Sequence, residues 1–198
     1  MPKLTERFHH AVILANKLHQ DQSRKLGKEI PYLSHLLRVS GLTLEYGADE
    51  DTAIAAILHD AVEDQGGMET ADLIRKRFND RVVGFVLECS DSTSAKNEKK
   101  LPWKGRKERY ITHLKTATAE AALISACDKL DNITSMTRGL IQEGLSIFNH
   151  FAGGKDGLLW YYQQILDVMQ ERKSPVTTEF KAAFLRFKEI LAQMEKEK

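Results

Sequence analysis

"ADEDTAIAAILHDAVED", residues 48–64, is the stretch that decides how the chain folds. Acidic residues at its start favour a helix N-terminus, and the apolar spacing that follows predicts a helix over Asp49–Val62. The last six residues hold one histidine and three carboxylates, His59, Asp60, Glu63 and Asp64. Such groups beside apolar neighbours are costly to bury unless something compensates them. A bound cation would do so; the alternative is a solvent-facing polar stripe on an ordinary helix.

The rest of the chain has the same helical character. Between a few prolines and glycines, apolar residues recur at helical spacing, and alternating runs rich in Val, Ile and Thr are scarce. Besides Asp49–Val62, the spacing predicts helices over Leu4–His19, Leu33–Tyr46, Glu69–Phe78, Val82–Cys89, Gly105–Thr116, Ala119–Arg138, Gly157–Glu171 and Thr177–Glu195. The predicted fold is all-α, a helical bundle of about eight or nine helices without a sheet.

Length and composition limit the class of protein. The 198 residues, 42% hydrophobic and 29% charged, predict a single globular domain over residues 1–198. We expect its core at about residues 4–138, with C-terminal helices at about 157–196 packing on it. A net charge of +1 gives no global attraction to nucleic acid or membrane. No signal-like or membrane-spanning run is present, so a cytoplasmic protein is expected; the oligomeric state is left open.

Cysteine and loop composition add two further predictions. Cys89 and Cys127 are far apart in sequence and form neither a disulfide framework nor a CxxC metal clip. Cys127 has an apolar setting and is predicted to be a small buried residue. The polar, basic segment Ser90–Arg109 is predicted to be a surface loop that leads into a helix. Such loops often carry function, and a solvated connector with one anchoring tryptophan is the alternative.

The polar patch needs partners from other helices to bind a cation. Residues four apart share a helix face, so Glu63 is expected one turn beyond His59, and Asp64 one turn beyond Asp60. Imidazole and carboxylate together suit divalent Zn, Mn or Fe. The second pair lies too far along the helix to share the same ion easily. It could instead hold or orient a water molecule near that ion.

Two other polar residues lie in apolar surroundings. His35, in "PYLSH", is on a helix whose other face is rich in leucine, and Asp128 follows apolar residues in "LISACDKLDNI". A carboxylate in such a setting needs a partner. The candidate metal ligands are therefore His35, His59, Asp60 and Asp128. Two imidazoles and two carboxylates leave coordination positions for water or substrate, as a catalytic metal site requires.

These pieces, in this order, resemble a known family. "RK" at Arg24-Lys25, "PYLSH" ending at His35, "ILHDAVED" and "CDKLDNI" are similar to motifs of the HD-domain metal-dependent phosphohydrolases. The resemblance is closer to their (p)ppGpp-hydrolase branch, the Rel/Spo-type hydrolase domains and the stand-alone small alarmone hydrolases. The matching pieces span about Leu4–Arg138. The residues "PWKGRKERYITHL", from Pro102, also look like bacterial single-domain members.

The resemblance implies hydrolysis of the 3′-diphosphate of a guanosine alarmone, which releases pyrophosphate and leaves GDP or GTP. It implies that one Mn²⁺ is held by the four candidate ligands. Glu63 and Asp64 would position and activate the attacking water. Arg24 and Lys25 would lie near the base or the phosphates, and Asn132 would contact the ribose or the 3′ phosphate.

A highly anionic substrate needs positive charge beside this acidic site. The basic stretch from residue 96 to residue 109 is one source, and its candidate 5′-phosphate contacts are Lys104, Arg106 and Lys107, with a solvated charge run as the alternative. Tyr161 is a candidate contact for the base or ribose. Lys129 follows Asp128 directly and could be a simple surface residue. Five histidines without partnered patterns are predicted to be structural or surface residues: His9, His10, His19, His113 and His150.

Three other functions stay open on the sequence. The same metal core would serve a hydrolase of another nucleotide, such as an adenosine alarmone or the 2′-phosphate of NADPH. A non-catalytic alarmone-binding protein is a second alternative, although every residue expected of a hydrolase is present. A structural helical protein with solvated polar pairs is the third. For each of the functions that involve a nucleotide, the expected partner is a small molecule, and neither nucleic acid nor a membrane is expected as a partner.

Overall fold

The computed structural model describes residues 3–26, 29–90 and 102–197. Over these residues it contains helices and no strand, which confirms the all-α prediction. In chain order the helices are α1 (Glu6–Leu18), α2 (Leu33–Glu45), α3 (Glu50–Ile57), α4 (Ala61–Asp64), α5 (Met68–Arg77), α6 (Asp80–Cys89), α7 (Trp103–Leu114), α8 (Ala119–Glu143), the 3-10 helix η1 (Gly144–His150), α9 (Gly154–Glu171) and α10 (Thr177–Lys196).

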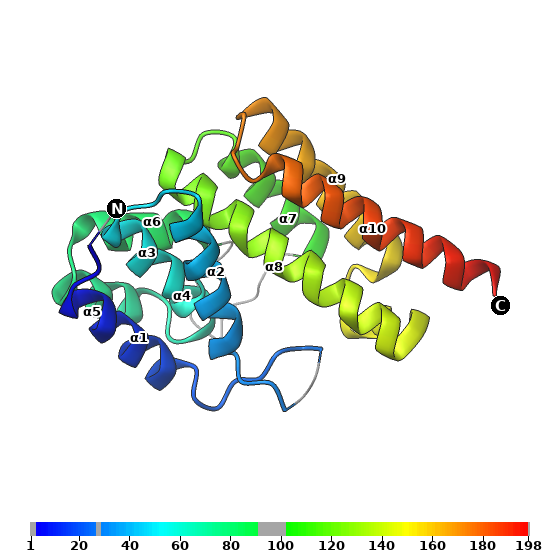
Figure 1. Cartoon of the computed structure of the whole chain (residues 1–198). Coiled ribbons are helices and arrows are strands. Elements are labelled where there is room, and N and C mark those ends of the chain that lie inside the picture. The colour runs from blue at the N-terminus through cyan, green and yellow to red at the C-terminus, as the bar shows by residue number, and fades with distance from the viewer. Residues whose placement is uncertain (1–2, 27–28, 91–101, 198) are drawn as a thin grey trace.

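The long helix α8 runs through the middle of the molecule (Figure 1). The N-terminal helices α1 to α6 lie on one side of it, where α2, α3 and α6 pack against it. On the other side α10 lies along α8, and α9 packs on α7 and α10. Because α8 contacts both groups of helices, a side chain on it can meet residues from distant parts of the sequence.

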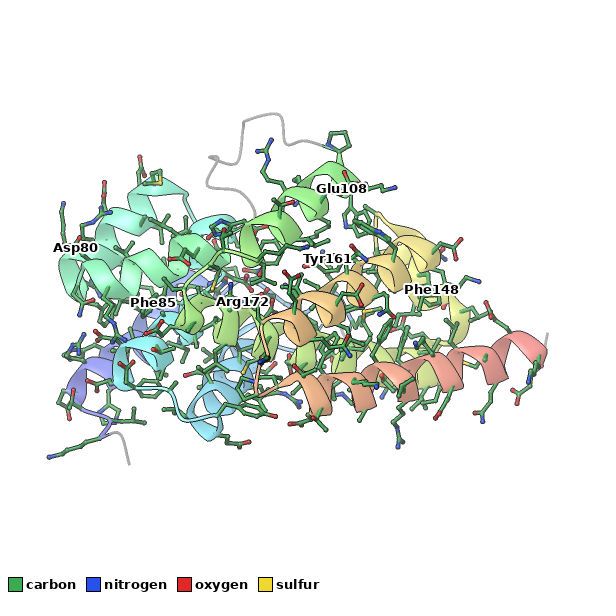
Figure 2. All side chains as sticks on the ribbon, turned by 90° about the horizontal axis from the view of Figure 1, so that it is seen from above. Asp80, Phe85, Glu108, Phe148, Tyr161 and Arg172 are labelled. Atoms are coloured by element: carbon green, nitrogen blue, oxygen red, sulfur yellow. The ribbon has the colours of Figure 1, made fainter. Side chains whose placement is uncertain are left out.

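One continuous apolar core joins the two groups of helices. Helix α3 is buried from Thr52 to its end at Ile57, and α8 buries a stripe that includes Ile124 and Ile133. On the far side, α10 contributes the fully buried rings of Phe180, Phe184 and Phe187. Figure 2 shows side chains filling the space between the ribbons from Phe85 to Phe148. Cys127 is fully buried, as predicted.

The predicted helix over residues 49–62 is wrong in one respect. It is two helices, because α3 ends at Ile57 and α4 begins at Ala61. The backbone between them forms tight turns, with the Leu58 N–H donating to Ala55 O at 3.1 Å and the Ala61 N–H donating to Leu58 O at 2.9 Å. No glycine or proline marks this break in the sequence. His59 and Asp60 therefore lie in a turn, not on a regular helix.

Helix α7 is anchored at both ends. Trp103 packs on Gly153, where a β-carbon would lie 2.7 Å from the indole ring, so this close approach requires glycine. At the other end Arg172, directly after α9, donates to the carbonyl oxygens of Leu114, Lys115 and Ala117 at 2.6–3.2 Å. These carbonyls are the unpaired acceptors of a helix C-terminus. The prediction of a loop up to Arg109 is thus wrong from Trp103 onward.

The connector between α1 and α2 is closed by backbone hydrogen bonds. Arg24 N–H donates to Ile30 O at 3.0 Å, and Tyr32 N–H donates to Gln22 O at 2.9 Å. This pairing directs the start of the connector back towards α8.

No helix in the three described ranges has both the length and the apolar character that a membrane span requires.

Candidate active site

The four candidate metal ligands converge from three parts of the fold. His35 comes from α2, His59 and Asp60 from the turn between α3 and α4, and Asp128 from α8. His35 Nε2 lies 3.3 Å from Asp128 Oδ1 and 3.6 Å from Asp60 Oδ2. His59 Nε2 lies 3.1 Å from Asp60 Oδ2 and 3.8 Å from Asp128 Oδ1. Both histidines and Asp128 are buried, with exposures of 1%, 3% and 6%.

These separations are those expected of ligands around one cation. Two donor atoms about 2.1 Å from the same ion, at angles of about 90° to 120°, lie roughly 3.0–3.6 Å apart. His35, His59 and Asp128 each offer a ligand atom within one such group. These three residues therefore have the dimensions of a candidate divalent-cation site with two nitrogen donors and one oxygen donor, and Asp60 lies beside both imidazoles as the proposed fourth ligand.

Hydrogen bonds at the far side of each imidazole aim Nε2 at the cluster. His35 Nδ1 lies 2.7 Å from Asp131 Oδ2, and His59 Nδ1 donates to Ala56 O at 2.8 Å. A ring that donates from Nδ1 presents a lone pair at Nε2, as metal ligation requires. His59 Nε2 is buried and has no hydrogen-bond partner among the described residues. A cation bound here would satisfy this nitrogen, so the residues fit the group.

The charged groups in the cluster shift one another's pKa values strongly. Burial lowers the pKa of His35, but hydrogen bonds to Asp128 and Asp131 outweigh it and raise this pKa to about 10. The pKa of His59 is also raised, since the charge of Asp60 outweighs burial. Burial raises the pKa of Asp60, yet the two histidines hold it well below its usual range. A cation would replace the imidazole protons, because ligands bind in their deprotonated form.

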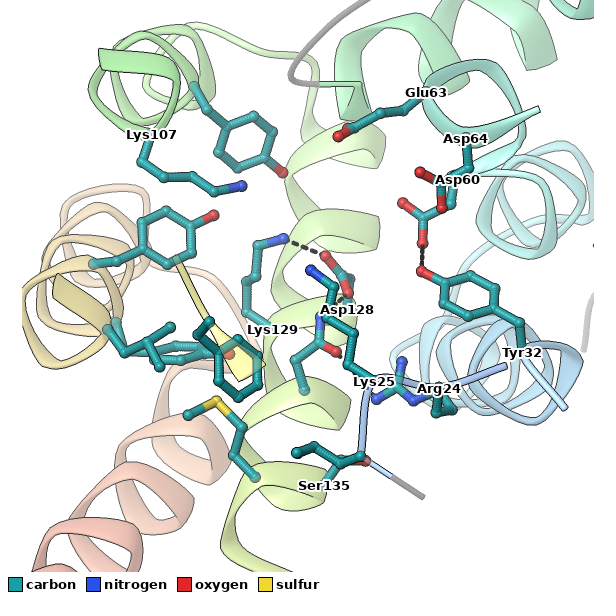
Figure 3. Close-up of a pocket in the computed structure, with 18 of the residues that line it drawn as sticks. Arg24, Lys25, Tyr32, Asp60, Glu63, Asp64, Lys107, Asp128, Lys129 and Ser135 are labelled. Atoms are coloured by element: carbon teal, nitrogen blue, oxygen red, sulfur yellow. Dashed lines mark hydrogen bonds and ion pairs between the residues drawn. The ribbon is translucent and has the colours of Figure 1, made fainter. Parts of the chain in front are cut away.

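Glu63 and Asp64 come from the short helix α4, directly after the ligand turn. Both line a pocket of about 390 Å³ that also exposes Asp60 and Asp128. Figure 3 shows Glu63 extending into this pocket from the wall that carries Asp60 and Asp64. Tyr32 donates a 2.6 Å hydrogen bond to Asp60 Oδ2 at the same wall. The acidic pair thus shares one cavity with Asp60 and Asp128, two of the four candidate ligands.

The opposite wall of the pocket is basic and aromatic. Lys107 of α7 lies across the cavity from Asp60 (Figure 3), with its ammonium 5.2 Å from the centre of the Tyr161 ring. Tyr161 and Arg106 also line the pocket. Lys104 is not among the lining residues; its ammonium lies 5.5 Å from the Trp160 ring. The predicted basic residues at 96, 99 and 100 lie outside the described residues.

The floor of the pocket contains the three other predicted contacts, Arg24, Lys25 and Asn132. Arg24 donates to Asn132 Oδ1 at 3.2 Å and to Asp131 Oδ2 at 3.3 Å. Asn132 in turn donates to Asp128 Oδ1. The Lys25 ammonium lies 6.0 Å from the Phe151 ring. Positive charge thus reaches the cavity from three elements, the connector after α1, helix α7 and, through Lys129, helix α8.

Three site residues were missed or misjudged on the sequence. Lys129 is not a surface residue, since it pairs with Asp128 and lies 5.2 Å from the Tyr110 ring. Burial lowers the pKa of Lys129, but Asp128 outweighs it and holds this pKa above its usual value. Asp131 is buried against His35, and its position three residues after Asp128 was the available signal. Tyr32, in "PYLSH", had no distinguishing pattern.

Residues 11–159 match the model of the family described as HD domain. A guanosine-3′,5′-bis(diphosphate) 3′-pyrophosphohydrolase of Aquifex aeolicus is 33% identical over 138 residues, 68% of this chain and 18% of that protein. The MESH1 proteins with the same activity in their name are 32% identical in Drosophila melanogaster and 33% in Xenopus tropicalis. The matches cover 60% and 65% of this chain, and 63% and 68% of those proteins. The chain therefore spans less than two thirds of the Aquifex and Drosophila proteins.

Two solved structures are similar over most of the chain. A metazoan ortholog of SpoT, described as hydrolysing ppGpp, superposes with a TM-score of 0.73 at 26% identity, covering 94% of this chain and 98% of that one. A protein of Listeria monocytogenes superposes with a TM-score of 0.63 at 32% identity, covering 80% of this chain and 99% of that one. The chain belongs to the HD-domain family, in the branch of the guanosine-3′,5′-bis(diphosphate) 3′-pyrophosphohydrolases.

Proposed function

We propose that the protein hydrolyses the 3′-diphosphate of ppGpp and pppGpp, which gives GDP or GTP and pyrophosphate. The observation that carries this proposal is a cavity of about 390 Å³ in which two candidate ligands, Asp60 and Asp128, and the acidic pair face a basic wall. A cation site alone would suit many hydrolases. The basic wall adds a preference for a substrate with several negative charges.

His35, His59, Asp60 and Asp128 would hold one divalent cation, which we propose is Mn²⁺. When bound, such an ion lowers the pKa of water and stabilises negative charge on phosphoryl oxygens. The ligand set also suits Fe, Co and Zn, so the identity of the metal rests on family resemblance. Asp131 supports the set from behind, because its carboxylate accepts the His35 Nδ1 proton.

Glu63 and Asp64 would take the proton of the attacking water. In the proposed reaction the water oxygen bonds to the phosphorus nearest the ribose, the bond from that phosphorus to the 3′ oxygen breaks, and this oxygen leaves with a proton. A carboxylate within reach of the water can act as the base. Two neighbouring carboxylates titrate apart because like charges repel, so the pair would share the work unequally.

The remaining pocket residues would hold the anionic substrate. Arg24 and Lys25, with Asn132, would contact the phosphates and the ribose from the floor of the pocket. Arg106 and Lys107 are proposed for the 5′ phosphates, and Tyr161 for the base or ribose. Lys104 is the weakest of the proposed contacts, since it packs on Trp160 away from the lining residues.

The experiment that tests this proposal is a substrate panel. Purified protein with Mn²⁺ is incubated with ppGpp, pppGpp, ppApp and NADPH, and pyrophosphate and phosphate are measured separately. Pyrophosphate from the guanosine alarmones alone would support the proposal. Faster turnover of ppApp, or phosphate released from NADPH, would assign the protein to another nucleotide. Tight ppGpp binding without turnover would make it a non-catalytic alarmone-binding protein.

Asp128→Asn is the matched control for the panel. The substitution keeps the size of the side chain but removes a ligand charge, so activity that depends on the cation should be lost. Activity that persists in this variant would indicate a contaminating hydrolase.

We further propose that residues 1–198 act as one HD-type domain in the cytoplasm, where guanosine nucleotides are made. We also propose that the protein acts on small molecules without nucleic acid or membrane partners.

A further inference from the structure

His19 is a buried histidine that the proposed mechanism does not use. It follows α1, is 2% exposed, and stacks on Tyr32 with ring centres 5.3 Å apart and planes at 19°. Its Nε2 atom is buried and has no hydrogen-bond partner within the described part of the chain. A buried nitrogen without a partner costs free energy. The contacts that hold the ring in this place are its stacking on Tyr32 and the hydrogen bond of its other nitrogen, Nδ1.

A chain of hydrogen bonds connects that nitrogen to the acidic pair. His19 Nδ1 lies 2.7 Å from Gln22 Oε1, and Gln22 Nε2 donates to Asp64 Oδ2 at 2.8 Å. Gln65 Nε2 donates to the same Gln22 oxygen at 2.7 Å. The amide of Gln22 is thus held by two neighbours on one side and by the Asp64 carboxylate on the other.

The charge of Asp64 fixes the direction of every bond in this chain. An ionised carboxylate can only accept, so the Gln22 amide must turn its NH₂ group towards Asp64. Its oxygen then faces His19 and Gln65 and can only accept as well. His19 must therefore donate from Nδ1, which leaves its Nε2 as an unprotonated lone pair. Burial, which lowers the pKa of His19, is consistent with a neutral ring.

Asp64 borders two spaces, so a clamp on its carboxylate would decide which of them the carboxylate faces. It lines the main pocket with Asp60 and Asp128, and it also lines a second hollow of about 420 Å³ on its other side. The second hollow is bounded by Leu18, Asp21, Gln22 and Gln65, without any of the ligands. Gln22 borders both spaces, so its bond to Asp64 lies in the wall between them.

We propose that His19 is a positioning residue that acts through Gln22 to keep Asp64 in the main pocket. Its effect on turnover rests on the proposed function, because Asp64 is there part of the water-handling pair. The ring contact with Tyr32, which donates to Asp60, gives His19 a second contact behind the same wall. One buried ring thus supports both the residue that would handle the proton and a candidate ligand.

His19→Asn and His19→Gln form a matched pair that tests the role of Nδ1. The asparagine NH₂ group reaches about the position of the histidine Nδ1, whereas the glutamine amide reaches that of Nε2. In the Mn²⁺-loaded protein, His19→Asn should keep kcat within about threefold of wild type, and His19→Gln should lower it about 10-fold to 100-fold. KM for ppGpp and the affinity for Mn²⁺ should change little in both. Equal losses of kcat in the two variants would overturn the proposal.

A double-variant cycle separates positioning from simple packing. Gln22→Met removes the amide with little change in volume and should lower kcat as His19→Gln does. If His19 acts through Gln22, adding His19→Gln to Gln22→Met should cause no further loss of kcat. Two losses that multiply would overturn the proposal, because they would mean that His19 acts by another route. Melting temperatures of all variants identify losses that come from unfolding.

The tautomer of His19 provides a readout that does not depend on activity. Long-range ¹H–¹⁵N NMR spectra of the full chain, loaded with diamagnetic Zn²⁺, should show the His19 proton on Nδ1 in wild type and lose that preference in Gln22→Met. A proton on Nε2 in wild type would overturn the proposal. If wild-type protein turned over none of the nucleotides, the proposed function would fail, and the NMR result would still decide whether the clamp exists.

Discussion

The Nδ1 atom of His35 lies 2.7 Å from Oδ2 of Asp131, and both side chains are buried. The same carboxylate pairs with Arg24 and Arg38. Burial raises the pKa of Asp131, but His35 and the two arginines outweigh it and lower this pKa. An ionised Asp131 therefore sets the direction of the His35 ring from behind. Asp131, which is not one of the candidate ligands, thus holds one of them in place.

Asp131→Asn should weaken metal binding. The amide oxygen can still accept from His35, but it lacks the charge that makes the imidazole a better ligand. Loss of such a supporting group costs about 10-fold to 100-fold in metal affinity, so we expect the Mn²⁺ Kd to rise by at least about tenfold. Isothermal titration calorimetry measures this directly. Asp72→Asn, which changes an exposed carboxylate on α5, is the control and should leave the Kd unchanged. An unchanged Kd in Asp131→Asn would contradict this account.

Mn²⁺ should stabilise the wild-type chain but not ligand variants. Binding to the folded state alone adds about 2.7 kcal/mol of stability at a metal concentration 100 times the Kd. His59→Ala and Asp128→Ala each remove one of four donors, and the rise in melting temperature on adding Mn²⁺ should largely disappear. Differential scanning fluorimetry with and without Mn²⁺ checks this. The same rise in both variants would mean that the ion binds elsewhere.

The acidic pair should be needed for turnover more than for metal retention. Glu63→Gln and Asp64→Asn keep the side-chain volume but remove the proton acceptor. We expect kcat to fall at least about 100-fold in one of them, because a positioned general base contributes roughly 10²-fold to 10⁴-fold. The Mn²⁺ content, measured by plasma mass spectrometry, should stay near one ion per chain. A Glu63→Gln protein that binds the metal and hydrolyses ppGpp at the full rate would remove Glu63 from the mechanism.

Lys129 should act on the metal and the substrate in opposite directions. Its ammonium pairs with Asp128 and lines the pocket, so it repels a cation and attracts a phosphate. Lys129→Gln is therefore expected to lower the Mn²⁺ Kd and to raise KM for ppGpp about tenfold, roughly the loss of one charge-assisted hydrogen bond. Lys104→Gln, at the neighbouring aromatic wall but outside the lining, is the comparison and should change KM less. A fall in both affinities together would indicate a packing defect.

A carboxylate far from the site should control stability in acid. Asp51 accepts from Arg7 at 2.6 Å and from Asn79 at 3.0 Å; burial raises its pKa, but these partners outweigh it and lower the pKa below 3.8. The lowered pKa means that Asp51 contributes stability above about pH 4, which is lost as the pH falls through its folded pKa. Asp51→Asn should cost about 1–3 kcal/mol at pH 7.

Urea unfolding of wild type and Asp51→Asn at pH 7 and at pH 3 measures this contribution. The difference in unfolding free energy between the two proteins should shrink at pH 3, because below the usual carboxylate pKa the proton binds the unfolded chain more readily than the folded one. Asp156→Asn, on the exposed face of α9, serves as the reference for a carboxylate without such partners. A difference that stays constant with pH would contradict the assignment to Asp51.

Local pattern was enough to predict most of the secondary structure. Apolar residues at helical spacing and the acidic start at Asp49 predict α3 before any contact is known, and the Asp49 carboxylate does cap this helix by accepting from Thr52 N–H at 2.9 Å. The break between Ile57 and Ala61 could not be predicted, because alanine, leucine and valine around it all continue a helix readily. Helix α3, which ends at this turn, packs against α2 and α8. We attribute the turn that carries His59 and Asp60 to this packing and not to local helix propensity.

The sequence by itself determined the chemistry available to this protein: two imidazoles, paired carboxylates and scattered basic residues on a helical chain. Only the tertiary structure decided which of them meet. It paired Lys129 with Asp128, placed Lys104 beside the Trp160 ring, and linked His19 to Asp64 through Gln22. The physical reason is that the spacing of apolar residues along the sequence predicts the face of a helix on which a residue lies. The direction of a long side chain depends on charges and rings that other helices bring to it.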